Sequence, residues 1–183
     1  FRLSLHLIIA FIILSLIYWS YLSLNVKSNF KDKINYIFPL IFIILIFFQI
    51  AIGAFVSGMD AGKIYNSWPL MGLKYFPDDS LIIDLFSLSA FNNPSLVQFI
   101  HRNLAYLIFI FYLYILFKVY KNSFVKLYSI VNTVGILLIL QIFLGILTLL
   151  FGAKIIISSL HQISSIFLVC SSIYFLFINT KFS

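Results

Sequence analysis

The chain of 183 residues has little charge, a single cysteine and no glutamate. Only 9% of its residues are charged and 63% are hydrophobic, a composition that excludes a soluble globular domain. The lone Cys170 excludes an intrachain disulfide, and we interpret it as a small core residue. The net charge of +7 comes from basic residues at the ends of apolar segments, so nucleic-acid binding is not expected. The composition predicts a polytopic protein embedded in a lipid bilayer.

Five apolar segments have about the length that crosses a bilayer as a helix. They are expected at residues 3–24, 36–57, 96–117, 124–151 and 155–178. The fold class is therefore all-α, a polytopic membrane protein with five transmembrane helices. The last four helices, joined up-down-up-down, are expected to form a four-helix bundle in which the helices at 96–117 and 155–178 are diagonal.

The basic residues predict the orientation of these helices. The first connection carries Lys27, Lys31 and Lys33, and the third carries Lys118, Lys121 and Lys126. By the positive-inside rule these connections and the tail with Lys181 face the cytoplasm or matrix, and the long second connection faces outward. A chain that starts outside without an export signal needs earlier spans. We therefore expect a fragment that lacks its amino-terminal half.

This orientation gives a provisional division into domains. Residues 1–24 are assigned to the last helix of a missing amino-terminal bundle, and residues 25–35 to an inner loop. Residues 36–183 are assigned to a carboxy-terminal four-helix bundle, with an outer loop at residues 58–95. Glycines and prolines in that loop predict a structured connection.

Two histidines lie about two helical turns inside apolar segments, at the same expected depth. A polar ring in hydrocarbon is costly unless it has a partner, so His101 and His161 predict a shared ligand. Haem iron is the leading candidate, because diagonal helices leave room for a flat macrocycle between two imidazoles. His6 has the same depth in the first segment. The alternative is that these histidines bond to Ser or Thr hydroxyls of neighbouring helices; zinc would lack further ligands at suitable spacing.

An internal repeat relates two helix pairs. Residues 49–53 (QIAIG) recur as residues 141–145 (QIFLG), and each is followed by a connection and a histidine helix. Gly53 and Gly145 would allow the backbone to approach a macrocycle closely. Arg102 is a candidate partner of a haem propionate, or else extends to the lipid headgroups. Trp68 is interpreted as an interfacial anchor or as part of a lid.

Longer motifs then resemble a known family. Residues 53–62 (GAFVSGMDAG), 65–71 (YNSWPLM), 98–102 (QFIHR), 141–149 (QIFLGILTL) and 161–162 (HQ) are similar to haem A synthases of the alphaproteobacterial and mitochondrial type. The resemblance covers nearly the whole chain. It implies eight transmembrane helices in two halves, and oxidation of a methyl group of haem O to the formyl group of haem A.

The resemblance also implies roles for particular residues. His101 and His161 would hold the iron of a haem b cofactor, and His6 would bind the substrate haem. Haem O synthase and cytochrome oxidase assembly factors are implied partners, in a bacterial cell membrane or the mitochondrial inner membrane. The family's other substrate-side histidine and its outer-loop glutamate are missing here, so this chain is expected to bind haem without being active alone. Two alternatives stay open, an electron-carrying membrane cytochrome b and a transporter fragment whose histidines relay protons.

Overall fold

The computed structural model describes residues 2–26 and 32–180, and in them the expected all-helical fold is confirmed. The five long helices are α1 (Arg2–Asn25), α2 (Ile37–Gly58), α3 (Pro94–Lys121), α4 (Val125–Leu150) and α5 (Ile155–Thr180). All five are long and apolar enough to cross a membrane, so the protein is an integral membrane protein. Short 3₁₀ helices at Ala61–Lys63 (η1), Ile82–Phe86 (η2) and Leu88–Asn92 (η3) lie in the loop between α2 and α3.

Helix α3 is longer than the hydropathy pattern predicts. It begins two residues earlier, because the Asn93 side chain accepts hydrogen bonds from the backbone N–H groups of Ser95 and Leu96. Pro94 occupies the first helical turn, where a missing N–H costs nothing. The helix continues to Lys121, and its last turn carries Lys118 and Lys121, basic residues that suit a helix C-terminus.

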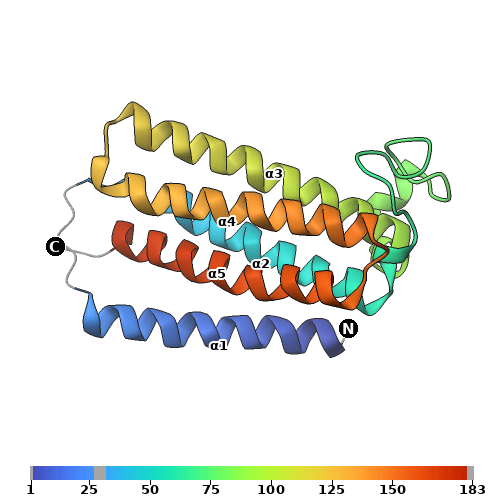
Figure 1. The fold of residues 1–183 in the computed structure, drawn as a ribbon, viewed down its shortest axis with the longest axis horizontal. Helices are drawn as coiled ribbons and strands as arrows, with labels where there is room; N and C mark the ends of the chain where they lie inside the picture. The colour runs from blue at the N-terminus through green and yellow to red at the C-terminus, as the bar shows by residue number, and fades with distance from the viewer. Residues whose placement is uncertain (1, 27–31, 181–183) are drawn as a thin grey trace.

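Helices α2 to α5 form the expected four-helix bundle (Figure 1). The packed pairs are α2 with α3, α3 with α4, α4 with α5, and α5 with α2, so α3 and α5 are diagonal in the bundle. Helix α1 packs on the outside of this bundle against α2 and α5. The assignment of α1 to a separate amino-terminal bundle stays a prediction.

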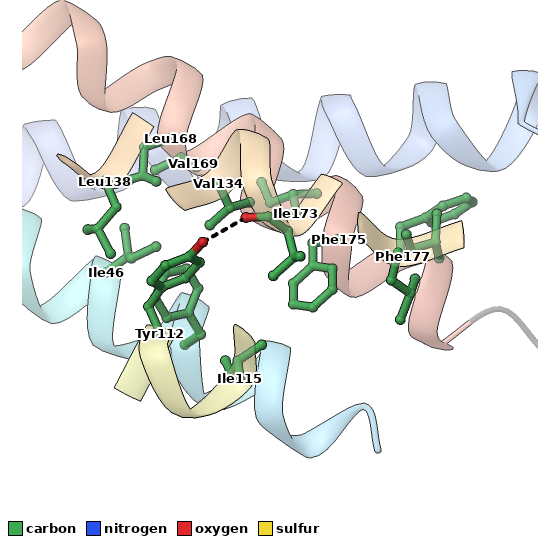
Figure 2. Packing of buried hydrophobic residues seen from close by; sticks show 14 of the residues in the cluster. Ile46, Tyr112, Ile115, Val134, Leu138, Leu168, Val169, Ile173, Phe175 and Phe177 are labelled. Carbon is green, nitrogen blue, oxygen red and sulfur yellow. Dashed lines mark hydrogen bonds between the residues drawn. The ribbon is translucent and has the colours of Figure 1, made fainter. Parts of the chain in front are cut away.

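The buried apolar core lies in one half of the bundle. Figure 2 shows Tyr112 of α3 among Ile46, Val134, Leu138 and Ile173, with its hydroxyl donating to the carbonyl of Val131 at 3.1 Å. Gly135 makes room for this phenol, because a Cβ there would clash with the Tyr112 hydroxyl oxygen. These contacts leave the other half of the bundle, toward the α2–α3 loop, outside the core.

The two ends of the bundle differ. We call the end that carries residues 59–93 the loop end; the short α4–α5 turn lies there too (Figure 1). At the opposite end, the backbone N–H of Ile34 donates to Asn179 at 2.9 Å, and that of Lys126 donates to Asp32 at 3.3 Å. Lys27, Lys31 and Lys181 fall outside the described residues, and the orientation in a bilayer stays a prediction.

Candidate functional site

His101 and His161 lie at matched positions in diagonal helices. Both α3 and α5 begin at the loop end, with His101 seven residues after Pro94 and His161 six residues after Ile155. At 1.5 Å of rise per residue, both histidines are about 10 Å along their helices. Both histidines therefore lie at the same level of two diagonal helices, as the sequence predicts.

Each imidazole lies against a glycine of the preceding helix. A Cβ at Gly53 of α2 would be 3.0 Å from Cε1 of His101, and a Cβ at Gly145 of α4 would be 3.3 Å from Cε1 of His161. Real Cβ atoms rarely approach another atom so closely, so any larger residue would push the ring away. Each glycine thus admits the adjacent imidazole, and its expected close approach to a macrocycle stays a prediction.

The repeat also places a glutamine one turn before each glycine. The Gln49 side-chain amide donates to the backbone carbonyl of His101 at 3.0 Å, and the Gln141 amide donates to that of His161 at 3.1 Å. Both bonds fix the height of a histidine helix against its neighbour. In the sequence these glutamines stand out only as part of the repeat. Each precedes its glycine by four residues, and this spacing places the glutamine and the glycine on the same face of the helix.

The two halves of the repeat are not identical. The Gln49 amide nitrogen also lies 3.3 Å from Nε2 of His101. The Gln141 amide instead donates to the Ser164 hydroxyl at 2.7 Å, and Ser164 donates in turn to the His161 carbonyl at 3.0 Å. The glutamine side chain therefore reaches the ring of His101, whereas in the described chain the hydrogen bonds between Gln141, Ser164 and His161 reach only the backbone of His161.

The imidazoles have unused hydrogen-bonding capacity. Nδ1 of His101 and Nδ1 of His161 are both buried and have no partner among the described residues. If the histidines only connected helices, each ring would bond to a Ser or Thr hydroxyl of a neighbouring helix. Among the described residues neither ring makes such a bond. Buried polar atoms without partners are uncommon in folded proteins and are a feature of ligand sites.

Around the histidines, the neighbouring segments of α3, α4 and α5 carry no fully buried residue, whereas Ile52 and Ala54 of α2 are buried. Buried side chains are found on α3 at residues 95–98 and again from Ile108, on α4 from Leu127 to Gln141, and on α5 from Ser164 onward. None of residues 99–107, 142–150 or 155–163 is fully buried, although all of them are described.

These features agree with a haem and less well with zinc. Two histidines on diagonal helices can approach a flat group from opposite faces, and the glycines leave each imidazole in a fixed place beside it. Among the described residues no three His, Cys or acidic side chains come together, as a zinc site would need. The identity of the ligand and the roles of His101 and His161 as its ligands stay predictions.

Arg102 holds the loop at the end of the site. Its guanidinium donates to the backbone carbonyls of Ser67 at 3.0 Å, Leu70 at 3.2 Å and Tyr65 at 3.0 Å. Gln98, one turn earlier on α3, donates to the same Tyr65 carbonyl at 3.1 Å. Nε of Arg102 is buried without a partner in the described chain, so a propionate contact stays a prediction.

The remaining candidates are not part of this cluster. His6 is exposed on α1, outside the four-helix bundle, so its role toward a substrate haem stays a prediction. Trp68 is 45% exposed and donates to the Tyr106 hydroxyl at 2.9 Å, which attaches the loop to α3. Asp60 forms an exposed ion pair with Lys63 at 2.7 Å, and surface pairs of this kind contribute little stability.

The fold defines a class, the polytopic membrane proteins built around a four-helix bundle. Comparison with known proteins gives the family. A model of the COX15-CtaA family, described as cytochrome oxidase assembly protein, matches residues 1–173. The chain belongs to this family, which confirms the resemblance expected from its motifs.

Curated relatives are named heme A synthase. The chain is 44% identical to the Pelagibacter ubique protein over 181 residues, covering 99% of this chain and 53% of that protein. It is 38% identical to the Rickettsia felis protein over 183 residues, covering 97% and 54%, and 38% identical to the Wolbachia pipientis protein over 180 residues, covering 96% and 50%. The chain spans about half the length of these relatives. No solved structure shows significant similarity to it.

Proposed function

We propose that this chain is the cofactor-binding half of a haem A synthase, an oxidoreductase of haem biosynthesis. In this proposal His101 and His161 are the axial ligands of a haem b. The observation that carries it is the repeated arrangement in which a glutamine fixes the histidine backbone and a glycine fixes the imidazole. The names of the curated relatives support the activity of the whole protein.

A haem bound there would supply an iron that takes up and releases single electrons. The protein's own residues bind and orient it. Gly53 and Gly145 let each imidazole lie flush against a neighbouring helix, and Gln49 and Gln141 set the height of the helices that carry them. Two imidazoles fixed before binding lose little conformational freedom when a ligand arrives, which favours binding.

The loop residues limit access to this layer from the loop end. Arg102 and Gln98 hold the carbonyls of Tyr65, Ser67 and Leu70 against the outer turns of α3. Asn66 donates to the carbonyls of Gly62 and Leu149, at 3.0 and 2.8 Å, and so connects the loop to the end of α4. A covered site of low polarity raises the strength of the electrostatic interactions within it.

The proposed reaction oxidises a ring methyl of haem O to the formyl group of haem A. The substrate haem would bind between His6 and the amino-terminal half of the whole protein. Conversion of a methyl to a formyl group takes one oxygen atom, which water can supply, and releases four protons and four electrons. A haem held by His101 and His161 would supply a one-electron carrier for this oxidation, with the final acceptor outside the chain. The location would be a bacterial cell membrane or the mitochondrial inner membrane, in contact with haem O synthase and cytochrome oxidase assembly factors. The fragment alone is expected to be inactive.

The test uses the full-length protein in membranes supplied with haem O. Haem extracted after turnover should contain haem A, and His101→Ala and His161→Ala should each abolish its formation together with the b-type spectrum. A bound haem b with haem O left unaltered would instead support an electron-carrying cytochrome. A colourless protein that still relays protons would support a transporter.

A further inference from the structure

Residues 81–88, at the loop end, expose a series of large apolar side chains. Those that are at least 65% exposed are Leu81, Ile82, Ile83, Phe86 and Leu88. Single exposed apolar residues are common on protein surfaces, but five in eight residues are unusual for a segment in water. The only charged side chain in this stretch is Asp84.

The polar groups of the segment are turned toward one another. The Asp84 carboxylate accepts a hydrogen bond from the backbone N–H of Leu81 at 2.9 Å, and the Ser87 hydroxyl donates to the Asp84 carbonyl at 2.9 Å. In a loop that faces water, polar groups point outward and apolar side chains pack inward. In this segment the polar groups bond to each other and the apolar side chains are exposed. This reversal fits an apolar environment around the segment.

The segment is attached to the first turn of α3. The Ser95 hydroxyl donates to Asp79 at 2.6 Å, the Asn93 side chain donates to Ser80 at 3.1 Å, and Phe91 packs against Phe55 of α2 with ring centroids 6.1 Å apart. These contacts lie on both sides of residues 81–88 in the sequence. They fix the segment beside the start of a membrane-spanning helix.

The length of α3 agrees with a first turn at the level of the lipid headgroups. Its 28 residues span about 42 Å, whereas the hydrocarbon core of a bilayer is about 30 Å thick. Leu107 and Ile110, farther along α3 from the loop end, are also exposed apolar side chains. Helix α1 packs on α2 and α5 and contacts neither α3 nor α4 extensively, so in the described chain it does not cover this side.

We propose that residues 81–88 lie in the boundary between headgroups and acyl chains of the leaflet at the loop end, with their exposed apolar side chains among the lipids. Interfacial segments of this kind are buried by about 5–10 Å. The occupant of this surface is the bilayer itself. The proposal does not depend on haem binding.

The experiment attaches a nitroxide spin label to single cysteines in the full-length protein, reconstituted in phosphatidylcholine–phosphatidylglycerol vesicles. Cys170 is replaced by Ser, and labels are placed at Phe86→Cys and Leu88→Cys. Ile110→Cys, on the exposed face of α3, is the lipid reference, and Lys63→Cys, in the same loop, is the water reference. Power saturation then compares collisions with oxygen, which dissolves in lipid, and with a water-soluble nickel chelate.

Labels at Phe86 and Leu88 should collide with oxygen more than with nickel, as at Ile110, and Lys63 should show the reverse. A preference for nickel at Phe86 and Leu88 would overturn the proposal, because the segment would be in water. Low accessibility to both reagents would also overturn it, because another protein surface would cover the segment. If the Cys170→Ser protein does not fold, Phe86→Trp is introduced into the protein that keeps Cys170. The new tryptophan should add fluorescence that brominated lipids quench. Added fluorescence that these lipids do not quench would refute lipid contact.

Discussion

Gly53 of α2 lies directly against the imidazole of His101, where a Cβ would be 3.0 Å from Cε1. Gly145 has the same relation to His161 at 3.3 Å, in the second half of the repeat. Because α2–α3 and α4–α5 repeat the same contact, both histidine rings are held in place by the backbone of a neighbouring helix. This relation makes the glycines a direct test of the site.

Replacing Gly53 by Ala should weaken haem binding more than replacing Gly145 by Ala, because the added Cβ is closer to its imidazole. Overpacking of this kind costs about 1–3 kcal/mol, which is about 5–150-fold in affinity. Titration of the haem-depleted protein with haem b measures the dissociation constant. Gly58→Ala is the matched control, since a Cβ there has nothing within 4 Å. Equal affinities for all three variants would refute the role of the glycines.

Gly135→Ala should destabilise the bundle without changing the haem spectrum. Its Cβ would clash with the Tyr112 hydroxyl oxygen in the core half shown in Figure 2, far from the histidine layer. We expect a loss of about 1–3 kcal/mol, measured as a lower melting temperature in detergent. Tyr112→Phe removes the clashing oxygen but leaves Cζ, which would be 2.6 Å from the new Cβ, so the double variant should recover only part of the loss. A double variant no more stable than Gly135→Ala would contradict this packing.

Arg102→Gln should loosen the loop at residues 65–70, because its guanidinium donates to three loop carbonyls. Limited proteolysis with trypsin measures this, since Lys63 and Lys74 flank the segment. Cleavage at both sites should become faster than in the parent protein. Cleavage after Lys154, in the α4–α5 turn, is the internal reference and should not change. Unchanged rates at Lys63 and Lys74 would show that other contacts hold the loop.

His6→Ala in the full-length protein should leave the cofactor haem bound and reduce conversion of haem O. His6 is exposed on α1, outside the bundle that contains the histidine pair. The amount of b-type haem per protein and the yield of haem A are measured on the same preparation. Loss of the b-type haem in this variant would mean that His6 binds the cofactor haem, and our assignment of His6 to the substrate haem would be wrong.

The sequence predicts the helices of this protein well, because a membrane span must satisfy its backbone hydrogen bonds internally and remain apolar for about 20 residues. It also predicts the level of His101 and His161, since depth follows from counting residues along a helix. The repeat at residues 49–53 and 141–145 further indicates that two helix pairs are related. These inferences need only local patterns.

The tertiary contacts of the site do not follow from local patterns. Arg102 binds carbonyls of residues more than thirty positions earlier, and a backbone carbonyl leaves no trace in the residue type. For the same reason the bond from Gln49 to the His101 carbonyl could not be predicted. The contact of Gly53 and Gly145 with the imidazoles could not be predicted either, because which group meets a glycine depends on how the helices rotate about their axes.

The central claim is that His101 and His161 together hold one haem, and a reduced-minus-oxidised absorption spectrum of the purified protein tests it most directly. The parent protein should show a low-spin b-type spectrum, which His101→Ala and His161→Ala should each abolish while His6→Ala retains it. A parent protein without haem, or a b-type spectrum that survives both single substitutions, would contradict the claim.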